Sequence, residues 1–152
     1  SKAYDRALRF LSYRPRSTAE VRRNLEGAGY DEEVIEATLG RLLEHGYLND
    51  AEFARYWVEN RQRFRPKGPQ ALRQELRQRG VDRDDIDETL SDLDTAEAAY
   101  RAAEPRAARM AALAREDPAT FRRKLSEFLL RRGFDHEAVQ EVVRRLLREM
   151  TT

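Results

Sequence analysis

Arginine and lysine side chains gather over residues 61–79, the part of the sequence best suited to bind anions. This stretch carries seven basic residues and one acidic residue, Glu75, so its formal charge is +6. Guanidinium groups make paired hydrogen bonds to phosphate oxygens, and clustered cations release counterions when they bind nucleic acid. Two arginines beside the rigid turn at Pro15 add a second basic site. The candidate binding residues are therefore Arg14, Arg16, Arg61, Arg63, Arg65, Lys67, Arg73 and Arg77.

An acidic stretch follows directly and offers a structural explanation for the same arginines. Residues 82–94 carry seven acidic residues and one basic residue, Arg83. The basic face could pair with this acidic helix in solvent, because exposed ion pairs are common and contribute only about 0–1 kcal/mol each. The loop arginines at 61–67 exceed what a helix end needs, which favours binding there. For Arg73 and Arg77 the two explanations are equally good.

Two further groups of residues are better explained by structure than by binding. Near the C-terminus, basic side chains fall close to expected helix ends, where the helix dipole favours cations. Tyr47, Phe53, Trp57, Phe64 and Phe128 are expected in the core rather than as platforms for bases. The C-terminal basic residues are Arg122, Arg123, Lys124, Arg131, Arg132, Arg144, Arg145 and Arg148.

Groups that could carry catalysis are few and do not converge. The chain has two histidines, His45 and His136, and no cysteine. Each histidine falls at an expected helix end in a different part of the chain, which explains it structurally. Adjacent carboxylates point in different directions on a helix, and no glycine-rich phosphate loop or metal-ligand spacing is present. We therefore expect a protein that is not an enzyme and that needs neither cofactor nor metal.

Composition points to amphipathic helices. Charged residues make up 38% and apolar residues 40% of the 152 residues, with a formal net charge of +1. The charge content exceeds the usual figure of about 25%, which suits helices with wide solvated faces. The lack of cysteine is compatible with a reducing compartment, and no apolar run approaches the ~20 residues of a membrane helix. We expect a soluble, cytoplasmic protein with no membrane contact.

One pattern occurs three times and organises these helices. Two apolar residues four apart are followed by a glycine, an apolar residue and an aspartate, and the glycines lie 51 and 53 residues apart. Such a glycine ends a helix in the left-handed conformation, and the aspartate caps the next helix. The three segments are Val21-x3-Leu25-x3-Gly29-Tyr30-Asp31, Leu72-x3-Leu76-x3-Gly80-Val81-Asp82 and Leu125-x3-Leu129-x3-Gly133-Phe134-Asp135.

A further amphipathic helix precedes each of these helix pairs. The sequence therefore predicts an all-α fold of three tandem three-helix repeats in an elongated array. Their expected bounds are residues 1–48, 49–94 and 95–152. In the third repeat, Pro105 should kink or restart the helix predicted over the alanine-rich stretch 96–115, because proline removes a backbone donor and crowds the preceding turn.

The motifs resemble those of one known family over nearly the whole chain. They occur in this order: Arg14-x-Arg16-Ser17-x-x-Glu20-Val21, Gly46-Tyr47-Leu48-Asn49-Asp50-x-x-Phe53-Ala54, Lys67-Gly68-Pro69-x-x-Leu72-Arg73-x-Glu75-Leu76-x-x-Arg79-Gly80-Val81 and Lys124-Leu125-x-x-Phe128-Leu129-x-x-Arg132-Gly133-Phe134. With these motifs the chain resembles the RecX family of recombinase regulators. Asn49 stands where that family more often has aspartate, and either residue can cap a helix.

The resemblance implies a function that composition alone does not. RecX-like proteins are non-enzymatic modulators of RecA in DNA recombination, repair and the SOS response. They lie along the groove of the RecA–DNA filament, limit its growth, and lower strand exchange and ATP hydrolysis. Some also bind DNA. The expected partners are thus the RecA filament and single- or double-stranded DNA. We expect the protein to be a monomer and to bind DNA of either kind only weakly without RecA.

The resemblance carries no binding residue over with it. The motif positions that transfer best, Gly29, Gly80, Leu72 and Leu76, are structural, so the candidate binding residues depend on charge alone. Two alternatives stay open. A stand-alone helical DNA-binding module would bind DNA tightly without RecA, and an adaptor for other proteins would bind neither.

Overall fold

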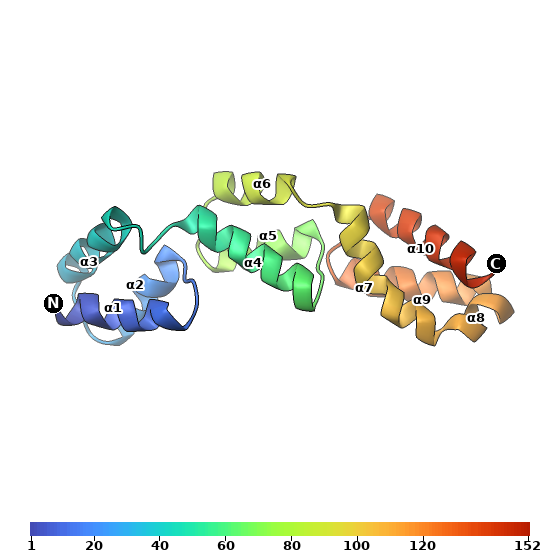
Figure 1. Cartoon of the computed structure of the whole chain (residues 1–152), viewed down its shortest axis with the longest axis horizontal. Coiled ribbons are helices and arrows are strands. Elements are labelled where there is room, and N and C mark those ends of the chain that lie inside the picture. The colour runs from blue at the N-terminus through green and yellow to red at the C-terminus, as the bar shows by residue number, and fades with distance from the viewer. The chain divides into compact units, whose positions relative to one another are not determined.

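A computed structural model describes residues 1–152, and all of its regular elements are α-helices (Figure 1). The all-α prediction is confirmed. None of these helices combines the length and the apolar character that a membrane-spanning segment needs. The helices are α1 (Lys2–Tyr13), α2 (Thr18–Gly27), α3 (Glu32–Glu44), α4 (Asp50–Phe64), α5 (Pro69–Gln78), α6 (Arg83–Ser91), α7 (Thr95–Arg109), α8 (Ala111–Glu116), α9 (Pro118–Arg131) and α10 (His136–Met150).

The repeated glycine and aspartate form the three predicted helix junctions, in which the glycine ends one helix and the aspartate caps the next. Gly29, Gly80 and Gly133 have φ angles of +90°, +79° and +90°, a conformation that glycine adopts at least cost. After each glycine, the next amide N–H returns to a carbonyl of the helix just ended, as Tyr30 does to Leu25 at 3.3 Å. The three aspartates cap the following helices by accepting hydrogen bonds from the amides of Val34, Asp85 and Ala138.

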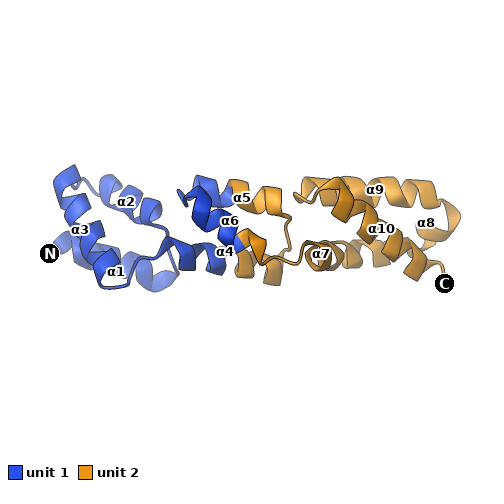
Figure 2. Ribbon diagram, turned by 90° about the horizontal axis from the view of Figure 1, so that it is seen from above, with its two compact units in different colours: residues 1–57, 75–89 blue, residues 58–74, 90–152 orange.

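Contacts divide the chain into two compact units, and the division falls within the middle repeat (Figure 2). Unit 1 contains residues 1–57 and 75–89, and unit 2 contains residues 58–74 and 90–152. The boundaries therefore fall inside α4, α5 and α6. The largest apolar cluster of unit 1 joins α1, α2 and α3, and it comprises Ala3, Tyr4, Ala7, Val21, Leu25, Ile35, Leu39, Leu42 and Leu48.

Within unit 1, the start of α2 packs closely against the end of α5. The hydroxyl of Ser17, which also caps α2, donates to the carbonyl of Arg79 at 2.6 Å. A Cβ on Gly80 would lie 2.4 Å from the Cβ of Ala19. Because a side chain at Gly80 would meet this neighbour and also strain a positive φ, the glycine serves both the turn and the packing.

Within unit 2, the start of α5 packs in the same way against the end of α9. The amide of Gly68 donates to the carbonyl of Arg132 at 2.7 Å, and the amide of Gln70 donates to that of Gly133 at 3.3 Å. A Cβ on Gly68 would lie 2.2 Å from the carbonyl oxygen of Gly133. This contact holds the loop between α4 and α5 beside α9.

Helix α7 continues through Pro105, and the chain breaks instead at Met110, where α8 follows. Of the two outcomes predicted at Pro105, a kink or a restart of the helix, the restart is wrong, because the helix is continuous there. Pro105 lies on the exposed side of the helix. Five buried alanines on the opposite side hold α7 in the core of unit 2: Ala98, Ala99, Ala102, Ala103 and Ala107. The short helix α8 is thus added to the three helices expected in this repeat.

Helix α7 is also tied to the C-terminal helix by a polar contact. The hydroxyl of Tyr100 donates to Glu149 Oε1 at 2.6 Å. The guanidinium of Arg145 lies 3.8 Å above the Tyr100 ring and 3.3 Å from Glu149. The hydrogen bond to Glu149 raises the pKa of Tyr100 to about 12, because ionisation would remove the donated proton and place a second negative charge beside the carboxylate.

This contact predicts a late-titrating tyrosine. We expect the difference in tyrosinate absorbance between wild type and Tyr100→Phe to titrate near pH 12 rather than near the ordinary value of about 10. Because the folded pKa is the higher one, the contact stabilises the fold below pH ~10 and loses that effect as the pH rises toward 12. Glu149→Gln should return the midpoint toward 10, and a wild-type midpoint near 10 would contradict the contact.

Candidate nucleic-acid interface

Two adjoining hollows lie in unit 2, beside the loop that follows α4 and helices α7 and α9; we call them the arginine hollows. Their volumes are about 350 and 420 Å³. They share Arg65, Arg106, Phe128 and Arg132, so they form one surface. No acidic residue lines either of them. The cationic lining residues are Arg61, Arg63, Arg65, Lys67, Arg101, Arg106, Arg109, Arg131 and Arg132.

The Phe128 ring on α9 organises the centre of this surface. Phe128 is almost fully buried, and the guanidinium carbons of Arg106 and Arg132 lie 4.2 and 4.6 Å from its ring centroid. A guanidinium over an aromatic face gains about 0.5–1 kcal/mol at exposed sites and more where water is excluded. The ring thus holds two like charges close together, with their remaining hydrogen-bond donors available to a ligand.

Arg132 shows the electrostatic cost of this arrangement. Burial lowers the pKa of Arg132 from its usual value, and the positive charges of Arg65 and Arg106 lower this pKa further. Its Nη1 donates to the carbonyl of Pro66 at 3.4 Å, which is a long hydrogen bond. An anion bound among these three arginines would offset their mutual repulsion and the lost solvation of Arg132. The hollow therefore favours an anionic ligand.

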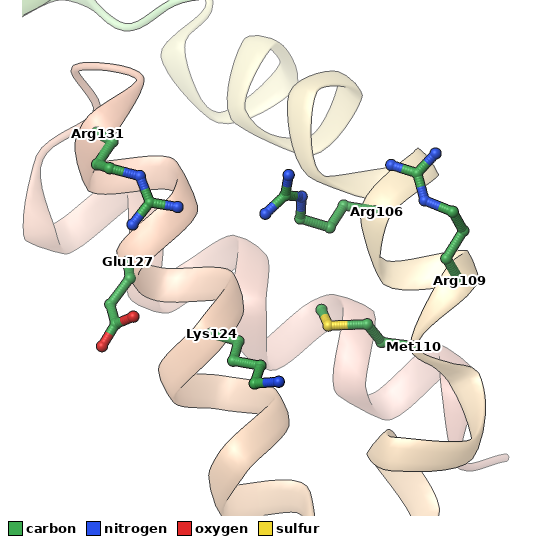
Figure 3. Close-up of a pocket in the computed structure, with 6 residues that line it drawn as sticks. All are labelled: Arg106, Arg109, Met110, Lys124, Glu127 and Arg131. Atoms are coloured by element: carbon green, nitrogen blue, oxygen red, sulfur yellow. The ribbon is translucent and has the colours of Figure 1, made fainter.

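A third hollow continues the basic surface between α7 and α9. It has a volume of about 330 Å³ and is lined by Arg106, Arg109, Met110, Lys124, Glu127 and Arg131. Figure 3 shows Arg106 and Lys124 extending from opposite sides into the space between the two helices, while the carboxylate of Glu127 points away. Glu127 lies 3.6 Å from Arg123, one turn earlier on α9. Phosphate groups could therefore be bound along both helices.

Half of the residues predicted from charge come together here. Arg61, Arg63, Arg65 and Lys67 all line the arginine hollows. Arg73 and Arg77, on α5, line none of the three hollows.

The two arginines beside Pro15 belong to unit 1 and make local contacts. Arg14 forms an ion pair with Glu20 at 2.7 Å. Arg16 lies over the Phe10 ring at 3.9 Å, and its Nε donates to the Phe10 carbonyl at 3.2 Å. Burial lowers the pKa of Arg16, and the charge of Arg14 adds to that effect. A binding role for these two residues stays a prediction.

Sequence reasoning missed the contribution of α7. Arg101, Arg106 and Arg109 stand in the alanine-rich helix, which offered no motif, although all three fall outside its buried alanine face. Arg131 and Arg132 were attributed to a helix end. The spacing of arginines and alanines in this helix could have shown that the arginines lie on its exposed side. It could not have shown that this side lies beside the loop that follows α4.

The aromatic predictions were right for two residues and wrong for two. Phe53 and Phe128 are buried, as expected. Tyr47 is 56% exposed and Phe64 is 74% exposed, so neither belongs to the core. Phe64 is the last residue of α4, and it lines the smaller arginine hollow. Trp57 is half-buried, and its Nε1 donates to Glu75 at 2.9 Å.

Comparison with known proteins gives one consistent result. The models of the first, second and third three-helix domains of RecX match residues 3–42, 49–90 and 92–143. The regulatory protein RecX of Chlorobium phaeobacteroides (strain BS1) is 36% identical over 147 residues, covering 97% of this chain and 95% of the relative. That of Amycolatopsis mediterranei (strain U-32) is 34% identical over 148 residues, covering 97% and 85%.

Solved structures agree with the sequence matches. The crystal structure of RecX from Lactobacillus salivarius superposes with a TM-score of 0.83 at 25% identity, covering 95% of this chain and 94% of that one. A second crystal structure, of a regulatory protein RecX, gives a TM-score of 0.77 at 29% identity, covering 93% and 70%. The prediction of three tandem three-helix domains is therefore confirmed.

Proposed function

Because this chain belongs to the RecX family of regulatory proteins, we propose that it regulates the RecA recombinase by binding the RecA–DNA filament and limiting its growth, strand exchange and ATP hydrolysis. The observation that carries the proposal is the set of arginine hollows in unit 2, where cations from a loop and from helices α4, α7 and α9 line one surface without an acidic residue. Such a surface suits the phosphate backbone of DNA within the filament.

Binding to the filament explains the charge balance better than binding to DNA alone. The formal net charge of the chain is only +1, although nine cations line the arginine hollows. Affinity for free DNA depends on the number of phosphates neutralised, and an otherwise neutral protein gains little outside its basic surface. Contacts with RecA would supply the remaining affinity and the specificity for the filament.

Regulation by binding also fits the surroundings of the histidines. His45 Nδ1 lies 2.9 Å from the hydroxyl of Tyr4, which joins α1 to the end of α3. His136 is the first residue of α10, directly after the capping Asp135. Both positions explain these side chains as parts of the helical framework.

The proposal predicts a dose-dependent fall in RecA ATPase activity on single-stranded DNA when this protein is added. Filaments seen by electron microscopy should become shorter over the same range, because binding in the groove would block extension. Unchanged ATPase activity at saturating protein, together with filaments of normal length, would exclude the proposed function. Binding to DNA that is tight without RecA would favour a stand-alone DNA-binding module instead.

A further inference from the structure

We propose that the smaller arginine hollow binds single-stranded nucleic acid in preference to duplex, with the ring of Phe64 as the platform on which an unpaired base stacks. This inference rests on the proposed function, because it assigns DNA to the same surface. It adds a specificity and names the side chain responsible.

The exposure of Phe64 is the first observation. Phe64 is 74% exposed, although a phenylalanine ring gains about 1.5–3 kcal/mol from full burial. It ends α4 directly before the loop that α9 holds in place, so its backbone is anchored. Arg63 lies with its guanidinium carbon 5.7 Å from the ring centroid. A large aromatic ring is thus presented to solvent beside a cation.

The lining of the hollow is the second observation. Phe64 shares it with the apolar surfaces of Pro66, Ala102 and Pro105, and with several arginines. Apolar groups suit the flat face of a base, and guanidinium groups suit the phosphates on either side of it. Aromatic platforms set within a cationic groove are characteristic of proteins that bind single strands. The cations around Phe64 are Arg63, Arg65, Arg101, Arg106, Arg109 and Arg132.

The difference between single strand and duplex follows from the state of the bases. In a duplex both faces of each base are stacked, so Phe64 gains nothing there unless the duplex opens, whereas an unpaired base offers a free face. The arginines contact phosphate in both cases. An acidic peptide would use the arginines and leave the ring unused. Only the single strand uses both parts of the hollow.

The test measures binding without RecA, by fluorescence anisotropy of three labelled probes with equal numbers of phosphates. The probes are an oligothymidine, a hairpin duplex closed by a non-nucleotide linker, and an abasic strand. Wild type should bind the oligothymidine most tightly. Phe64→Ala should weaken binding of the oligothymidine about tenfold and leave the other two affinities and all salt dependences unchanged. Phe64→Tyr should restore the wild-type affinity, because a tyrosine ring stacks equally well.

Tyr13→Ala is the matched control, since Tyr13 is 82% exposed and belongs to unit 1. It should change none of the affinities. Three results would each overturn the inference. Phe64→Ala could lose the same affinity for all three probes, or it could lose no affinity for the oligothymidine. Wild type could also bind the hairpin as tightly as the oligothymidine. The RecA ATPase titration is independent of these results. If RecA ATPase activity falls but the protein shows no preference for the single strand, only this inference is refuted. If the protein prefers the single strand but RecA ATPase activity is unchanged, only the proposed function is refuted.

Discussion

Replacing Gly68 with alanine is expected to lower the free energy of unfolding by about 2–3 kcal/mol. The new Cβ would lie 2.2 Å from the carbonyl oxygen, 2.3 Å from the carbonyl carbon of Gly133 and 2.5 Å from the amide nitrogen of Phe134. These are backbone atoms, so no side-chain rotation can relieve the overlap. The start of α5 must move away from the end of α9, which would break the hydrogen bond from the Gly68 amide to Arg132.

Urea unfolding followed by circular dichroism measures this change, and Gly40→Ala is its control. Gly40 is exposed within α3, and a Cβ there meets nothing within 4 Å. Alanine at that position should stabilise the protein by about 0.5–1 kcal/mol, because glycine is a poor helix former. If Gly68→Ala were as stable as wild type, the close contact between α5 and α9 would be wrong.

The motif Lys67-Gly68-Pro69 can now be explained one residue at a time. Pro69 begins α5, where the missing N–H costs nothing. Gly68 permits the backbone of α5 to touch that of α9. Lys67 lines the larger arginine hollow, and Gln62 Nε2 donates to the carbonyl of Lys67 at 3.0 Å. The motif therefore fixes the loop that contributes cations to the proposed binding surface.

Local features were predictable from the sequence because they depend on a few neighbouring residues. A glycine at positive φ followed by a capping aspartate defines a helix junction wherever it occurs, so the three-fold repeat could be read directly. The basic stretch at 61–67 was recognisable for the same reason, since its charge lies within a few residues, although Arg61 and Arg63 belong to the end of α4 and only Arg65 and Lys67 to the loop.

The complete binding surface depends on packing between distant segments, and packing was not predictable. Arg101 and Arg106 meet Arg65 only because Gly68 seats the loop against Gly133, and no local pattern encodes that contact. Helix α7 continues through Pro105 for a similar reason, because buried alanines before and after the proline pack in the core of unit 2, and this packing is not visible in the local sequence.

Reversing two charges at this surface should have the largest effect on binding. Arg65 and Arg131 are both exposed and line the larger arginine hollow. The double variant Arg65→Glu/Arg131→Glu should bind an oligothymidine about 100-fold more weakly at low salt. The slope of log affinity against log salt concentration should fall in magnitude by about 1.4, because a single strand releases about 0.7 counterion per phosphate contact. A correspondingly higher concentration should be needed to lower RecA ATPase activity.

The control keeps the change in net charge and alters only its position. Arg144 and Arg148 are exposed on α10 of the same unit and line none of the three hollows. Arg144→Glu/Arg148→Glu should therefore retain most of the affinity and nearly the whole salt slope. Equal losses in the two double variants would mean that binding senses only total charge, and the arginine hollows would then have no special role. If only Arg65→Glu/Arg131→Glu loses affinity, the phosphate contacts lie at the arginine hollows, whose arginines are held by the Phe128 ring and by the close contact at Gly68.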